Sequence, residues 1–115
     1  MLSRQNRLTK RKDFDTLFKR GKLVYGRHAQ MRVAKTDPSH ETRIAVIVSA
    51  KTEKSAVRRN RVKRQAREVL RLTLSQVKPG YDVAITLRAS FVPLTYAEKR
   101  NVLLTGLSKA GLLKL

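Results

Sequence analysis

The stretch AVRRNRVKRQAREVLR, residues 56–71, carries seven cationic side chains and a single carboxylate within one predicted helix. Because successive helical residues are about 100° apart, its small apolar side chains and a following threonine fall within a sector of about 60°. These residues are Val62, Ala66, Val69 and Thr73. The opposite side carries Asn60 and most of the cations, so one face can pack onto a core while the other forms a basic strip. Asn60 adds an amide donor and acceptor to the guanidinium donors, which favours a polyanion of defined shape as the partner.

The composition is that of a small and very basic protein. The chain has 115 residues, the size of one domain with a modest core, and a net charge of +19 at pH 7. A compact domain this basic repels itself, so the charge indicates an anionic partner, and nucleic acid is favoured over a membrane or an acidic protein. A membrane-surface binder would need bulky apolar residues opposite the cations, whereas residues 56–71 offer only a small face.

The chain shows no sign of export or of a membrane span. No apolar run approaches the roughly 18 residues that cross a bilayer, and the first residues lead into cations rather than an apolar signal core. Cysteine is absent, which excludes disulfides and thiolate metal sites and fits a reducing compartment. We therefore expect a cytoplasmic protein, monomeric by itself, forming a single RNA-binding domain over 1–115 with residues 1–8 as an extended, flexible basic arm.

Apolar periodicity predicts the element order α-β-β-β-α-β-α. The expected strands cover 23–25, 29–34, 44–48 and 81–87. The second alternates between apolar and polar residues, while the third is apolar throughout, as expected of a central strand covered on both faces. The fold class is therefore α/β (α+β), a two-layer sandwich with a mixed four-stranded sheet.

Capping residues bound the three expected helices. Thr9 is the predicted cap of a first helix over about 10–20, and Gly21 is its stop. Ser55 is the candidate cap of the basic helix. Thr95 and Glu98 have the spacing of a capping box, which opens a last helix to about residue 110.

The sequence contains no catalytic or metal-binding motif. His28 and His40 are isolated and have no cysteine to join them at a metal ion. Phosphate-binding glycine loops and the nucleophile elbow are also missing. We therefore expect no catalytic residue, no metal site and no cofactor in the protein itself, so that any chemistry belongs to its partner.

With these parts assembled, the chain resembles the protein subunit of bacterial ribonuclease P, from about Arg7 to the last helix. The most specific element is Arg59-Asn60-Arg61, followed by Val62-Lys63-Arg64 and then by Arg67. Supporting matches are Arg7-Leu8, Asp13-Phe14, Phe18, Gly21, Arg27, Arg43, Val48-Ser49 and Lys51. Arg-Asn-Arg alone is a weak match, but in this register, on a basic helix after a buried strand, it is a strong one.

The resemblance implies a role and a topology. The family's protein is a small cofactor for a large catalytic RNA, which removes the 5′ leader from precursor tRNA. The RNA and its bound divalent metal ions, Mg²⁺ above all, perform the hydrolysis. The family fold also implies a left-handed β-α-β crossover around the basic helix, the reverse of the general rule.

The resemblance further implies two sets of contacts. The contacts to the catalytic RNA are expected from Lys51, Arg58, Arg59, Asn60, Arg61, Lys63, Arg64, Arg67 and Arg71. The leader of precursor tRNA is expected in a cleft between the first helix and the sheet, at Lys12, Phe14, Phe18, Tyr25, Arg27 and Arg32. From the residues alone, the i, i+4 spacing of Phe14 and Phe18 with Leu17 fits core packing equally well, and that alternative stays open.

Two positions depart from the family pattern. Ala50 precedes Lys51 where a second lysine is usual, so we expect one basic contact fewer near the motif. Arg32 replaces an aromatic residue often found on the second strand, so the cleft is expected to rely more on charge. The alternative function is that of a ribosomal or RNA-assembly protein without enzymatic association; the register of the motif and Asp13-Phe14 favour ribonuclease P.

Overall fold

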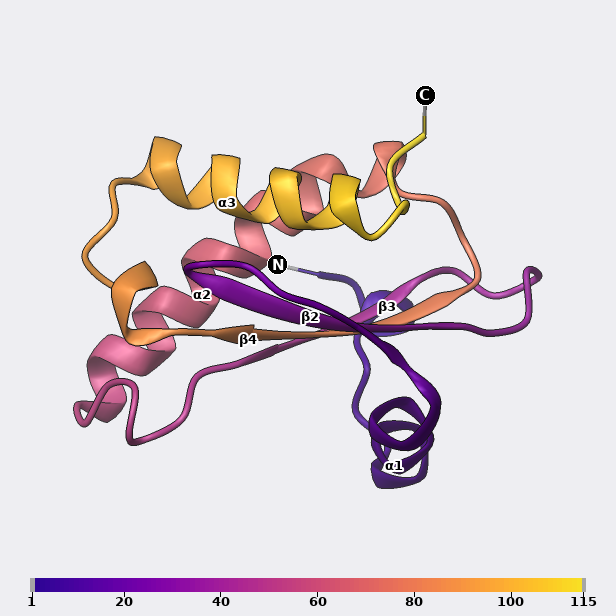
Figure 1. Ribbon diagram of the computed structural model, residues 1–115, viewed down its shortest axis with the longest axis horizontal. Coiled ribbons are helices and arrows are strands. Elements are labelled where there is room, and N and C mark those ends of the chain that lie inside the picture. The colour runs from indigo at the N-terminus through magenta and orange to yellow at the C-terminus, as the bar shows by residue number, and fades with distance from the viewer. Residues whose placement is uncertain (1, 115) are drawn as a thin grey trace.

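The computed structural model of the protein describes residues 2–114, in which a four-stranded sheet carries helices on both faces (Figure 1). The strands are β1 (Lys22–Val24), β2 (Ala29–Lys35), β3 (Arg43–Ile47) and β4 (Tyr81–Leu87), in the spatial order β1-β2-β4-β3. β1, β2 and β4 pair antiparallel, whereas β3 runs parallel to β4. The sheet is therefore mixed, as expected.

Within the described residues, three α-helices and three short 3₁₀ helices complete the fold. The α-helices are α1 (Arg11–Arg20), α2 (Ala56–Thr73) and α3 (Tyr96–Lys109). The 3₁₀ helices are η1 (Arg4–Asn6), η2 (Leu74–Gln76) and η3 (Ala89–Phe91). α2 and α3 cover one face of the sheet and α1 lies against the other (Figure 1). α2 connects the parallel strands β3 and β4; the left-handedness of this crossover stays a prediction of the resemblance.

The main core lies between the sheet and the pair α2–α3. Alternate strand residues, including Met31, Ile44 and Ile85, pack against the small apolar face of α2 and against α3. Ala66 is fully buried at this contact and Val62 is 3% exposed, so the narrow apolar sector read from the sequence is the packed face of α2. A smaller cluster on the opposite face joins Leu8 and Leu17 to Ala84 beneath α1.

Two of the predicted caps are present and one is not. The Ser55 hydroxyl accepts a hydrogen bond from the backbone N–H of Arg58 at 3.3 Å. Thr95 and Glu98 form a reciprocal capping box at the start of α3. The prediction for Thr9 was wrong, because α1 begins after Lys10, whose carbonyl accepts the N–H of Asp13 and of Phe14, both at 3.1 Å.

The N-terminal segment differs from the extended, flexible arm that the sequence suggested. Residues 2–8 contain a 3₁₀ turn, and Leu2, Asn6 and Leu8 are buried, because apolar side chains in this basic segment reach both cores. The Leu8 N–H donates to the Ile44 carbonyl at 3.1 Å, next to a bridge between Arg7 and Ile44. The strand order places β3 at the edge of the sheet rather than at its centre, and its continuous apolar run reflects cover on both faces.

Arg43 ties α1 to the sheet through two carboxylates. Its Nε and Nη2 atoms donate to the two carboxylate oxygens of Asp82 on β4, each at 2.8 Å, and its Nη1 donates to Asp13 on α1 at 3.0 Å. The Asp82 side chain is 6% exposed and that of Asp13 is 26% exposed. The hydrogen bonds that Arg43 donates to the Asp82 carboxylate raise the pKa of Arg43. The guanidinium is thus a fixed link between β3, β4 and α1.

We expect the two partners of Arg43 to contribute unequally to stability. Asp82→Asn should lower the free energy of unfolding by roughly 3 kcal/mol, because it leaves a partly buried cation without its bidentate partner. Asp13→Asn should cost about 1 kcal/mol or less, because that ion pair is more exposed. Urea denaturation followed by circular dichroism measures both values, and equal losses would contradict the unequal burial.

Candidate nucleic-acid interface

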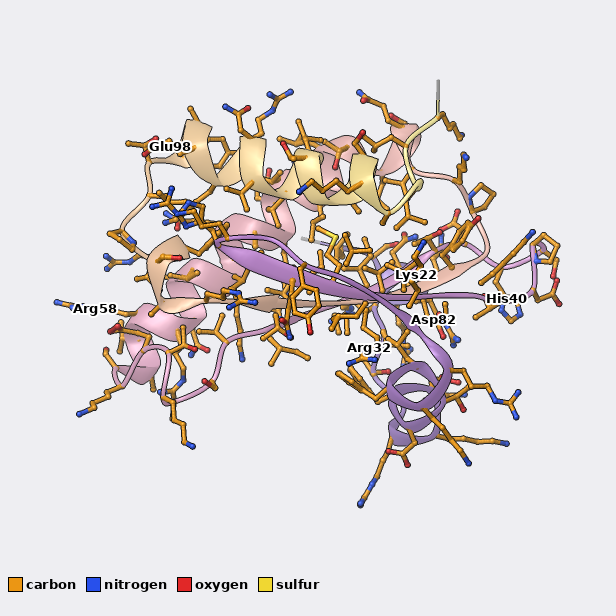
Figure 2. The ribbon with its side chains drawn as sticks, viewed as in Figure 1. Lys22, Arg32, His40, Arg58, Asp82 and Glu98 are labelled. Atoms are coloured by element: carbon orange, nitrogen blue, oxygen red, sulfur yellow. The ribbon has the colours of Figure 1, made fainter. Side chains whose placement is uncertain are left out.

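The basic strip of α2 faces solvent along the length of the helix. Arg58, Asn60, Arg61, Arg64 and Arg71 are exposed, and Arg59, Lys63 and Arg67 are half-buried along the sides of the helix. Figure 2 shows Arg58 projecting from the N-terminal end of α2, away from the rest of the molecule. Lys51 is exposed in the turn between β3 and α2. The structure therefore presents all nine residues expected to contact catalytic RNA on one helix and the turn before it.

Three of these arginines also have partners inside the protein. Arg59 donates from Nη1 to the carbonyl oxygens of Glu53 and Lys54, at 2.8 and 3.0 Å, and so holds the turn that leads into α2. Arg58 lies 3.8 Å from the Glu53 carboxylate. Arg71 forms two hydrogen bonds with Glu68, at 2.6 and 3.1 Å. The sequence did not reveal that Arg59 holds this turn, because the carbonyls it binds precede the helix.

The remaining residues of the strip are available to a ligand. Within residues 2–114, the side chains of Asn60, Arg61, Lys63, Arg64 and Arg67 make no hydrogen bond or ion pair. The bond from Arg71 lowers the pKa of Glu68 to about 2, so this carboxylate stays ionised and paired with Arg71 at neutral pH. The helix thus offers several unsatisfied donors in a row, which is the arrangement that phosphate oxygens bind.

The α1-covered face of the sheet brings together three of the residues expected at the leader. The Phe14 and Phe18 rings stack with centroids 6.5 Å apart and an interplanar angle of 16°. The guanidinium of Arg32 extends from β2 toward α1 and lies 5.6 Å from the centre of the Phe18 ring (Figure 2). Phe14 packs in the small core beneath α1, whereas Phe18 is 45% exposed. Core packing therefore describes Phe14, and Phe18 presents a ring to solvent.

Arg32 has one polar atom without a protein partner. Its Nε is buried, yet it has no hydrogen-bond partner within residues 2–114. A buried N–H without an acceptor costs free energy.

The other three expected leader residues lie apart from this group. Lys12 is exposed on the outward side of α1, beside Asp15 and Thr16. Tyr25 and Arg27 lie in the turn between β1 and β2, where they line a pocket of about 250 Å³ that α3 closes. The register of the β1–β2 hairpin causes this separation, because Val24 pairs with Met31 and the turn therefore extends beyond the end of the pairing.

Tyr96 was not among the residues expected to bind RNA. It is the first residue of α3, is 46% exposed and lines a groove with Arg64 and Arg67 of α2. The sequence marked its position only through the Thr95 cap. The start of α3 lies beside the middle of α2 because of tertiary packing, which no local sequence pattern predicts.

Two further searches of residues 2–114 gave negative results. No group of three or more His, Asp or Glu side chains is placed so that it could hold a metal ion. No helix in that part of the chain is both long and apolar enough to cross a membrane.

Comparison with known proteins gives a consistent family. The family model described as Ribonuclease P matches residues 2–111. The Ribonuclease P protein component of Pseudanabaena sp. (strain PCC 6903) is 36% identical over 113 residues, covering 98% of this chain and 97% of that protein. That of Clostridium botulinum (strain Langeland / NCTC 10281 / Type F) is 34% identical over 110 residues, covering 95% and 97%.

Solved structures agree with these relatives. The RNase P protein of Staphylococcus aureus superposes with a TM-score of 0.83 at 25% identity, covering 95% of this chain and 98% of that one. The RNase P protein from Thermotoga maritima gives a TM-score of 0.76 at 27% identity, covering 86% and 92%. Together with the Arg59-Asn60-Arg61 motif on the basic face of α2, these matches show that the chain belongs to the ribonuclease P protein family.

Proposed function

We propose that this chain serves its holoenzyme through two surfaces, α2 for the catalytic RNA and the α1-covered sheet face for the leader of precursor tRNA. As a ribonuclease P protein component, the chain is a subunit of a ribonucleoprotein endoribonuclease that matures the 5′ ends of tRNAs, and its partner is the RNA subunit. The observation that carries the proposal is the row of solvent-facing donors on α2 without protein partners.

The α2 surface suits the backbone of a folded RNA. Asn60, Arg61 and Arg64 are exposed on a straight helix, and guanidinium groups bind phosphates in a bidentate manner. The deep groove of A-form RNA hides base edges, so phosphates and 2′-hydroxyls are the expected contacts. Arg59 donates from Nη1 to the Glu53 and Lys54 carbonyls, and its other N–H groups remain available to RNA.

The α1 face suits a single strand. The exposed ring of Phe18 offers a stacking surface, and Arg32 beside it offers an unsatisfied buried donor. Aromatic faces and cations bind unpaired nucleotides without reading their sequence. Lys12 adds a charge on the outward side of α1. A leader that continues around the end of β1 reaches Tyr25 and Arg27.

The chemistry remains with the RNA in this proposal. Mg²⁺, which the family resemblance implies for the holoenzyme, is assigned to sites that the RNA builds. The protein's cations replace part of the counterion atmosphere that two closely packed RNAs need. The proposal also takes the isolated subunit to be monomeric and the holoenzyme to act in the cytoplasm.

Reconstitution provides the first test. RNA-free protein should not cleave precursor tRNA, whereas protein added to a bacterial ribonuclease P RNA should increase cleavage at low magnesium, because its charge lowers the repulsion between the two RNAs. The measurement is the rate of 5′-leader release over a magnesium series. Cleavage by protein freed of RNA, or an RNA rate that the protein leaves unchanged at every magnesium level, contradicts the proposal.

A charge-matched pair of variants tests the α2 surface. Arg64→Ala should weaken binding to the catalytic RNA by about 1–3 kcal/mol, because a charge-assisted contact is lost. The slope of log K against log salt should also fall by roughly one. Lys35→Ala removes the same charge from the exposed last residue of β2, outside α2, and should leave both quantities nearly unchanged. Equal effects of the two variants would contradict a specific role for α2, because each cation would then act only through the net charge of the protein.

Leader length tests the α1 face. Arg32→Ala should weaken holoenzyme binding of precursor tRNA with a long leader by about 1–3 kcal/mol. It should leave the affinity for mature tRNA unchanged, since mature tRNA has no leader to contact. Arg20→Ala, an exposed cation at the end of α1, controls for the loss of one charge. A uniform loss across long-leader, one-nucleotide-leader and mature substrates would place Arg32 outside the leader site.

A further inference from the structure

We propose that the groove between α2 and the first turn of α3 holds one unpaired nucleotide of the catalytic RNA, with its base stacked on Tyr96 and its phosphate paired with Arg64 and Arg67. This inference rests on the proposed function, in which α2 binds that RNA. It extends the RNA-binding surface from one helix to two.

The groove has the shape and lining that a nucleotide needs. It is formed by Arg64, Gln65, Arg67, Glu68 and Tyr96 and has a volume of about 440 Å³. Tyr96 is 46% exposed, so much of its side chain is open to a ligand. Its ring therefore presents apolar surface in the same groove that the side chains of Arg64 and Arg67 line.

Both walls of the groove are held in place. On α3, the Thr95 N–H donates to Glu98 Oε1 at 2.9 Å and the Glu98 N–H donates to Thr95 Oγ1 at 3.2 Å, which fixes the turn that carries Tyr96. Between the helices, Lys99 Nζ donates to Gln65 Oε1 at 2.7 Å. Lys99 is only 5% exposed and its ammonium lies 5.8 Å from the centre of the Phe91 ring. A preformed site of this kind loses little conformational entropy on binding.

The charges in the groove favour an anion. Glu68 is the only carboxylate in the lining, and its two oxygens are hydrogen-bonded to Arg71. Arg64 and Arg67 have no side-chain partner within residues 2–114. The side chains that line the groove therefore carry a net positive charge, which favours a phosphate.

The combination of ring and cations identifies the ligand as a nucleotide. An acidic peptide would use the two arginines but would leave the aromatic face without a matching group. A nucleotide supplies both a phosphate and a flat base, and stacking on tyrosine is a usual way to bind one. The base must be unpaired, since bases within a duplex have their faces covered by their neighbours.

A tryptophan reporter tests the stacking directly. The chain contains no tryptophan, so Tyr96→Trp introduces a single indole at the proposed contact. Addition of a bacterial ribonuclease P RNA should quench its fluorescence, because a stacked base quenches an indole. Ser108→Trp places the indole at an exposed position 12 residues along α3, roughly 18 Å away, and should respond little. Absence of quenching at position 96, or equal quenching at both positions, overturns the proposal.

Affinity and salt dependence separate stacking from charge. Tyr96→Ala should weaken binding of the same RNA roughly 5- to 150-fold, the range for one stacked base. It should leave the salt slope unchanged, since the ring neutralises no phosphate. Tyr96→Phe keeps the ring and should bind almost as well as the parent protein. A loss with Phe as large as with Ala, or no loss with Ala, overturns the stacking.

The controls distinguish this inference from the proposed function. If the parent protein does not bind the RNA, the proposed function fails and this inference fails with it. If the parent protein binds with a steep salt dependence and Tyr96→Ala binds equally well, only the nucleotide groove is refuted. Thermal unfolding of each variant shows that the helix start remains folded, which is expected because Ala is a strong helix former at an exposed position.

Discussion

The guanidinium of Arg43 is the point at which three elements of this fold are joined. It leaves the edge strand β3, binds both oxygens of Asp82 on β4 and reaches Asp13 on α1. Strand pairing alone would fix β3 beside β4, but the cluster beneath α1 contains few large apolar residues. The ion-pair network therefore fixes the position of α1 against the sheet, which the small apolar contact alone would not do. The placement of Phe18 over Arg32, and with it the proposed leader surface, depends on where this link holds α1.

The fold accommodates the high charge of α2 because its apolar sector is buried, some of its cations are paired and the others are spaced along the helix. The apolar sector is buried against the sheet, Arg59 is tied to two backbone carbonyls and Arg71 is tied to Glu68. The remaining cations are spread along an 18-residue helix, where water and salt screen them. A free subunit can therefore fold with these groups unpaired, and binding a polyanion relieves their mutual repulsion.

The parts of the structure that the sequence predicted were those with a strong local signal. The face of α2, the alternation of β2, the Ser55 cap and the Thr95–Glu98 capping box are all readable because the relevant residues are neighbours along the chain. The family motif added the role in ribonuclease P, which composition could not distinguish from that of another RNA-binding protein.

The errors came from contacts between distant segments. β3 was expected at the centre of the sheet because its apolar run indicates cover on both faces, and that pattern does not say which edges are paired. The N-terminal residues looked like a solvated arm because their charges conceal Leu2 and Leu8. Tyr25 and Arg27 were expected at the leader together with residues of α1; the hairpin register places them in a pocket beside α3, and their contact with a leader stays a prediction. Each of these depends on tertiary packing.

The bridge between Arg7 and Ile44 affects the tendency of the free subunit to aggregate. An open edge strand with apolar flanks is a template on which a second chain can add, and such addition leads to aggregation. Here the N-terminal segment covers that edge with a single bridge at Arg7, which lies between η1 and α1, so it offers no long run for further pairing. The covered edge and the mutual repulsion of highly charged copies act in the same direction. Both features disfavour sheet-edge pairing between two copies of the subunit.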